Sequence, residues 1–130
     1  MDSEKTILYS ACLMMEIAKA DNIITKDELN IIEEILLDFY KISNQKALDM
    51  INASYKELEE SIDIFQYATF LNINLSYKDR LDLIKCIFEV GYADGKLHYL
   101  EYHYIKTISN LLKIEKRDLI KAKLEIKNYF

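Results

Sequence analysis

Residues 92–101 read YADGKLHYLE, and this stretch contains one of only two glycines in the chain. Residues 19–28 read KADNIITKDE and share its skeleton: an Ala-Asp pair, an aliphatic residue three positions after the aspartate, and a glutamate seven positions after it. A segment that occurs twice in one chain indicates a repeated structural unit. We therefore predict the fold from these two segments and the sequence around them.

The two copies align at an offset of 73 residues, so that residues 15–39 fall on residues 88–112. Charged, turn and core positions agree together in this register, which makes the repeat credible. The matched pairs are Glu16 and Glu89, Ala20 and Ala93, Asp21 and Asp94, Asn22 and Gly95, Ile24 and Leu97, Glu28 and Glu101, Ile32 and Ile105, and Ile35 and Ile108.

Each copy predicts a helical hairpin. A helix ends near Asp21 or Asp94, and the next residue needs a left-handed backbone to turn the chain, which Gly95 adopts freely and Asn22 tolerates. A second helix then begins with its glutamate in the first turn, where the helix dipole favours a negative charge. We expect two such hairpins, packed against each other with pseudo-twofold symmetry.

The whole chain is predicted to be one all-α domain, residues 1–130, with about seven helices and repeat units at about 4–42 and 77–114. It has no proline, few glycines and 51% hydrophobic residues, which favours helices over a turn-rich β fold. The helix from about residue 4 to Asp21 has almost no polar face and should be central. Capping signals precede the helices after Thr25 and Ser76, and either Ser43 or Asn44 can cap the third helix. The fourth helix starts somewhere near residues 54–61. Glu16 and Glu89, inside apolar runs, are expected on a narrow exposed edge.

Charge and cysteine content narrow the classes of function. The first 65 residues carry 14 acidic and 6 basic side chains, which argues against a nucleic-acid-binding protein. The basic side chains near the C-terminus could contact an anionic surface, but we interpret them as a solvated helix face. Two cysteines in apolar runs suggest a reducing compartment, and neither a signal peptide nor a transmembrane segment is expected, so the protein should be cytoplasmic. The basic residues near the C-terminus are Lys113, Lys116, Arg117, Lys121, Lys123 and Lys127.

The repeated Ala-Asp-Gly pattern, with its aliphatic residue and its glutamate, resembles the TerB-like family, which includes tellurite-resistance protein B and the N-terminal domain of DjlA-type co-chaperones. Residues 93–97 with Glu101 are the better copy, and residues 20–24 with Glu28 have Asn22 in place of the usual glycine. The resemblance implies a single helical bundle with two hairpins and a link to tellurite or other chemical stress. It also implies a metal site made by acidic residues, although Lys96 and His98 stand where relatives have more acids.

Two interpretations of the repeated acids follow. Asp21, Glu28, Asp94 and Glu101 could converge near the pseudo-twofold axis and bind a divalent cation, because hard cations prefer several oxygen ligands. The alternative is structural: the aspartates accept hydrogen bonds in their own turns, and the glutamates cap their helices. The spacing is not that of an EF-hand loop, so a metal site would need ligands from separate segments.

A second set of residues suggests an interaction surface. Tyr92, His98, Tyr99 and Tyr102 gather in and after the repeated segment, and tyrosine is enriched in binding patches. No nucleophile with a plausible His and Asp set occurs, and no phosphate-binding glycine loop, so we predict no enzyme activity. The first function expected is a noncatalytic stress-associated accessory domain with an acidic cation site. The alternative is a metal-free protein-interaction or oligomerisation module, with an unidentified protein partner or a second copy.

Overall fold

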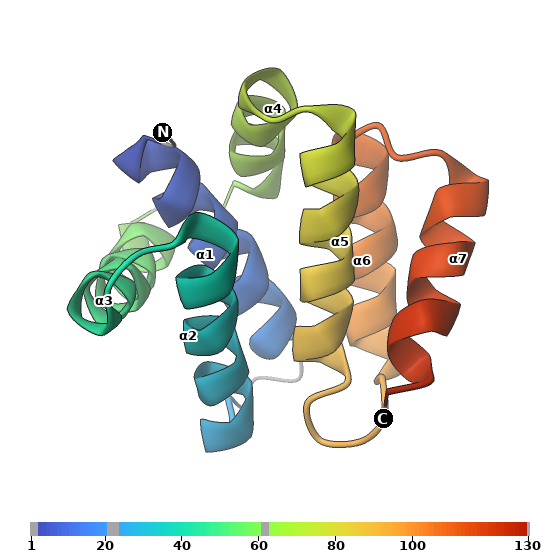
Figure 1. Ribbon diagram of the computed structural model, residues 1–130, viewed down its shortest axis with the longest axis horizontal. Helices are drawn as coiled ribbons and strands as arrows, with labels where there is room; N and C mark the ends of the chain where they lie inside the picture. The colour runs from blue at the N-terminus through green and yellow to red at the C-terminus, as the bar shows by residue number, and fades with distance from the viewer. Residues whose placement is uncertain (1–2, 21–23, 61–62, 130) are drawn as a thin grey trace.

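The computed structural model describes residues 3–20, 24–60 and 63–129, and these residues form helices and short connections with no strand. The predicted all-α bundle of about seven helices is confirmed (Figure 1). Its elements in chain order are α1 (Glu4–Ala18), α2 (Lys26–Tyr40), α3 (Asn44–Glu60), α4 (Ile64–Asn74), α5 (Tyr77–Gly91), α6 (Tyr99–Leu111) and α7 (Lys116–Lys127).

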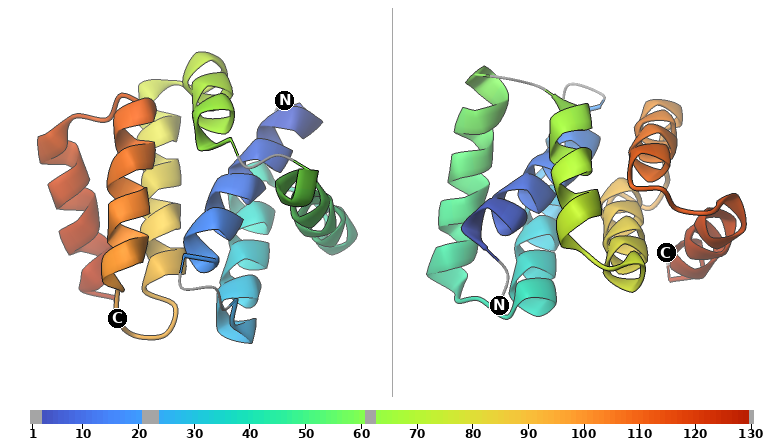
Figure 2. Two further views of the ribbon diagram at one scale, coloured as in Figure 1. Left: turned by 180° about the vertical axis from the view of Figure 1, so that it is seen from behind. Right: turned by 90° about the horizontal axis from the view of Figure 1, so that it is seen from above.

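The two repeat units form two neighbouring hairpins. Helix α1 packs on α2, and α5 packs on α6. The hairpins meet where α1 contacts α5 and α6, and where α2 contacts α5. Figure 1 shows α3 at one end of the bundle beyond α1 and α7 at the other end beyond α5, and the view from above in Figure 2 agrees. The helices of the two hairpins therefore form the centre of the molecule, and α3 and α7 are its flanks.

Side-chain caps start most of the helices, as their sequences indicate. A hydroxyl of Ser3, Thr25, Ser43 or Ser76 accepts a hydrogen bond from the backbone three residues later. The fourth helix differs from the expectation: α3 continues to Glu60, and α4 begins only at Ile64, with the Asp63 carboxylate as its cap.

Helix α1 is the centre of the core, as predicted, and every residue from Tyr9 to Ala18 is buried. One expectation about it was wrong. Glu16 was expected on an exposed edge but is only 8% exposed, because α1 is surrounded by neighbouring helices. Burial accordingly raises the pKa of the Glu16 carboxyl, while the nearby Lys19 charge lowers it. Glu89, its repeat partner on α5, is half-buried.

The turn of the second hairpin has the predicted backbone, since Gly95 has a φ of 95°. A methyl group on Gly95 would meet no atom within 4 Å, so the backbone angle alone explains the glycine. The chain's other glycine, Gly91, has a different role. A Cβ there would lie 2.6 Å from Cδ1 of Leu97, so its absence makes room for Leu97 to pack on the core. The predicted turn at Asn22 lies outside the described residues.

Candidate functional site

Of the four predicted metal ligands, Asp94 is held within its own turn. Its Oδ1 accepts a hydrogen bond from the Lys96 amide at 3.3 Å, and its Oδ2 lies 3.1 Å from Nε2 of His98. This is the behaviour expected of a turn aspartate. Asp21, its counterpart in the first repeat, lies outside the described residues.

Glu28 and Glu101 occupy equivalent positions at the starts of α2 and α6, and both are buried, with exposures of 6% and 1%. Glu28 forms a capping box: its Oε1 accepts from the Thr25 amide at 2.8 Å, and its own amide donates to the Thr25 hydroxyl at 3.1 Å. Glu101 accepts from the His98 amide at 3.0 Å in the same way. Each glutamate therefore caps the second helix of its own hairpin.

The two glutamates also interact with each other across the hairpins. The pKa of Glu101 is raised to about 7, chiefly by burial and further by the charges of Glu28 and Asp94. The His98 amide and side chain act in the opposite direction. Burial is therefore the main cause of the raised pKa of Glu101, and the charges of Glu28, from the other repeat, and of Asp94 make smaller contributions. Within residues 3–20, 24–60 and 63–129, no three His, Cys, Asp or Glu side chains are arranged to hold one metal ion.

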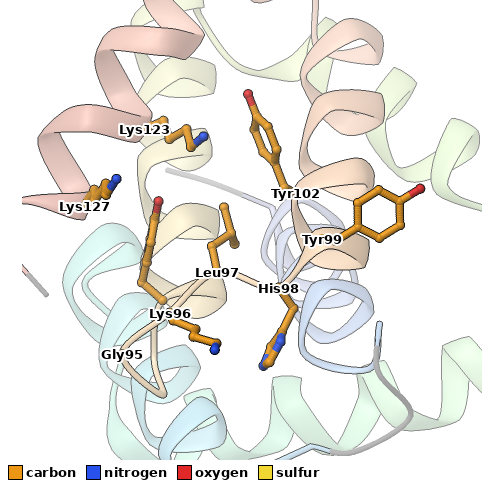
Figure 3. Close-up of a pocket in the computed structure, with 9 residues that line it drawn as sticks. Gly95, Lys96, Leu97, His98, Tyr99, Tyr102, Lys123 and Lys127 are labelled. Atoms are coloured by element: carbon orange, nitrogen blue, oxygen red, sulfur yellow. The ribbon is translucent and has the colours of Figure 1, made fainter.

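The four residues of the predicted interaction surface line one pocket of about 380 Å³, between the α5–α6 turn and α7 (Figure 3). Tyr92 is only 5% exposed. Tyr102 lies on α6, and Figure 3 shows its ring on the side of Lys123. Tyr99 is 82% exposed and points away from α7, while His98 is turned toward Asp94. Of the tyrosines labelled in the view, Tyr102 is therefore the one whose ring faces α7, while Tyr92 is part of the buried wall.

Three lysines that were not predicted to belong to the interaction surface complete this pocket. Lys96 comes from the turn, and Lys123 and Lys127 come from α7. The Lys123 ammonium lies 4.1 Å from the centroid of the Tyr102 ring, which is the geometry of a cation–π contact. The sequence alone favours a solvated face for the two α7 lysines and leaves contact with an anionic surface as the alternative. Their spacing of four residues placed them on one side of a helix, but no local signal indicated which element that side would face.

Another group of acids lies on the opposite side of α5. Glu34 and Asp38 of α2 share a groove with Cys86 and Glu89 of α5. The pKa of Glu89 is raised by burial first and then by the charges of Asp38 and Glu34. The pKa of the Cys86 thiol is raised to about 12, so this cysteine is a poor nucleophile at neutral pH. This groove therefore has no feature of a thiol-based reactive site.

Within the described part of the chain, no helix is both long enough and apolar enough to cross a membrane.

Comparisons with known proteins agree with the helical architecture. No curated protein matches the sequence. A solved structure, that of a protein of unknown function from Porphyromonas gingivalis W83, superposes with a TM-score of 0.72. It shares 16% sequence identity and covers 98% of this chain and 92% of its own, which supports the fold. The sequence itself matches the family described as tellurite resistance protein TerB over residues 8–124. With most of its length inside that match, and with the two acidic hairpins side by side, the chain belongs to the TerB family.

Proposed function

We propose that this chain is a noncatalytic accessory domain whose paired acidic helix starts bind a divalent cation. The observation that supports this proposal is the burial of one carboxyl from each repeat, Glu28 and Glu101, together with the repulsion by which the Glu28 charge adds to the raised pKa of Glu101. A cation near both would relieve that repulsion. The donor set fits a hard ion, because carboxylate oxygens are the ligands that Ca²⁺, Mg²⁺ and Mn²⁺ prefer.

The residues that would hold the ion are Glu28 and Glu101, with Asp94 and Asp21 supplied by the two turns. Both glutamates use Oε1 to cap their helices, which fixes their orientation. Asp94 is half-exposed and bonded within its turn, so binding would require it to exchange those contacts for the cation. Asp21 is included because it is the repeat partner of Asp94.

We expect a divalent cation to raise the melting temperature of protein that was first treated with EDTA. A ligand at about a hundred times its dissociation constant adds roughly 2.7 kcal/mol to the free energy of unfolding. For a domain of this size, this corresponds to a shift of several degrees. The measurement is thermal unfolding with calcium, magnesium, manganese or zinc, each added separately.

Matched variants separate ligands from turn residues. In Asp21→Asn/Asp94→Asn, the shift should disappear, because the amide retains hydrogen-bonding ability but loses the charge. In Asp27→Asn/Asp79→Asn, which removes two exposed first-turn acids from α2 and α5, the shift should persist. If no ion raises the melting temperature of the unsubstituted protein, the repeated acids are caps and turn residues only.

The name of the family supports a role in the response to tellurite or to other chemical stress. We therefore expect a strain that lacks this protein to grow more slowly in tellurite than its parent. Complementation with the unsubstituted gene should restore growth, and complementation with Asp21→Asn/Asp94→Asn should not. Equal growth of the parent and the deletion strain in tellurite would contradict a role in the tellurite response. The cation site would then still be tested by the thermal unfolding experiment.

A second function, a metal-free protein-interaction module, is favoured by a separate observation. The predicted interaction residues line one pocket, and that pocket also carries three lysines. Its test is whether the pocket's backbone amides respond, in NMR spectra recorded in EDTA, to any peptide from a panel of different charge. A lack of response to every peptide would contradict this function.

A further inference from the structure

The pocket between the α5–α6 turn and α7 is a positively charged surface on an acidic protein. The chain has a net charge of −5, yet the side chains that line this pocket include Lys96, Lys123 and Lys127 and no carboxylate. In the part of the chain that the structure describes, none of these three lysines forms an ion pair with an acidic side chain. The Asp94 carboxylate contacts the Lys96 amide and the His98 ring within the α5–α6 turn, so it offsets part of this charge. The three lysine ammonium groups, which form no ion pair with an acidic side chain, still favour an anionic ligand.

Aromatic surface lies next to this charge. Tyr92 forms part of the pocket wall, and the Tyr102 ring carries Lys123 on its face. A second lysine, Lys106, lies 4.8 Å from the centroid of the same ring. The pocket therefore offers apolar contact and positive charge together, from three separate segments of the chain.

We propose that this pocket binds an acidic peptide segment of a protein partner, with its carboxylates near Lys123 and Lys127 and an apolar side chain against Tyr92 and Tyr102. The proposal rests on the interaction function stated above and names its ligand. The spacing of the charges supports an extended ligand, because Lys123 and Lys127 are one helical turn apart and Lys96 comes from a different element.

Other anions fit the pocket less well. A phosphate group is usually bound by free amides at a helix start or by arginine in a bidentate arrangement. Here the His98 amide at the start of α6 already donates to the Glu101 carboxylate, and the described lining contains no arginine. A nucleic acid is disfavoured because it carries a charge on every nucleotide, and the three lysines of this pocket could neutralise only a few of them.

The test is an NMR titration of ¹⁵N-labelled protein in EDTA with three peptides. One peptide carries several glutamates around a single phenylalanine, the second has glutamine in place of each glutamate, and the third has lysine there. We expect the acidic peptide alone to shift the amides of the α5–α6 turn and of α7, with an affinity that falls as salt is added.

Two charge reversals on α7 locate the contact. Lys127→Glu, inside the pocket, should weaken binding of the acidic peptide about ten-fold, because a reversed charge repels the ligand. Lys121→Glu makes the same change on an exposed residue of α7 that does not line the pocket, and should alter binding by less than about two-fold. Both positions are exposed, so both variants should fold.

The outcomes separate this proposal from the broader interaction function. Equal binding of the acidic and the glutamine peptide, or equal loss in the two variants, would overturn recognition of acidic segments. A response to the neutral or the basic peptide alone would overturn recognition of acidic segments but would leave a protein-interaction function in place. If none of the three peptides shifts the amide signals, both the recognition of acidic segments and the interaction function are contradicted. If the protein forms a dimer that Lys127→Glu dissociates, the pocket is occupied by a second copy, which also overturns the proposal.

Discussion

Replacing Leu13 by Ala is expected to lower the free energy of unfolding by about 2–5 kcal/mol, the range for large-to-small substitutions in a packed core. Leu13 is fully buried in α1, and α1 contacts α2, α3, α4, α5 and α6. The lost methyl groups therefore leave a cavity at the centre of the bundle, where few neighbours can move to fill it. Chemical denaturation with urea, monitored by circular dichroism, measures the change.

Leu124→Ala is the matched control for that experiment, because Leu124 lies on α7 and is 54% exposed. Its effect should stay within about 0.5 kcal/mol, as is usual for surface positions. Similar losses in the two variants would contradict the placement of α1 at the centre.

The stability of the protein in EDTA is expected to fall as the pH rises from about 5 to about 8, the reverse of the behaviour of a salt-bridged carboxylate. Glu101 has a pKa raised from 4.5 to about 7 in the folded protein. Between these two values the folded state binds a proton more tightly than the unfolded state, so folding loses stability as pH rises through this window. The loss from Glu101 alone is up to roughly 3 kcal/mol, and the raised pKa values of Glu16 and Glu89 act in the same direction.

Glu101→Gln should make the pH dependence shallower and should increase stability at pH 8. Glutamine can still accept the His98 amide hydrogen bond through its carbonyl oxygen, but it carries no charge to oppose Glu28. Glu101→Ala removes both the cap and the charge, so it should flatten the pH profile without the gain in stability. Glu59→Gln, on an exposed part of α3, serves as the control and should leave the profile unchanged.

Much of the fold could be predicted because the same kinds of capping and turn residues occur in both copies of the repeat. Thr25 with Glu28, Ser76, and Gly95 each specify a helix start or a turn through contacts within a few residues, and all three behave as their sequences indicate. The start of α4 was not placed, although Asp63 with Gln66 three residues later is a capping pattern of the same kind. Gly91 also went unnoticed, because its role depends on Leu97 packing over it rather than on its own backbone.

The candidate site was less predictable because it depends on contacts between elements. The sequence indicated that Glu28 and Glu101 are equivalent, but their burial and mutual repulsion follow from the packing of the hairpins. The burial of Glu16 was missed for the same reason, since a single charged residue in an apolar helix does not show how many helices surround it. The presence of Lys123 and Lys127 in the pocket depends on where α7 packs, which the repeat does not specify.

The proposed cation site depends on the pairing of Glu28 and Glu101, and an NMR titration of the Glu101 side-chain carboxyl carbon tests that pairing. In EDTA, we expect a pKa near 7 in the unsubstituted protein and a lower pKa in Glu28→Gln, because the opposing charge is removed. A saturating divalent cation should lower the pKa of Glu101 as well. A pKa near 4.5 that responds neither to Glu28→Gln nor to any cation would contradict both the acid pair and the cation site.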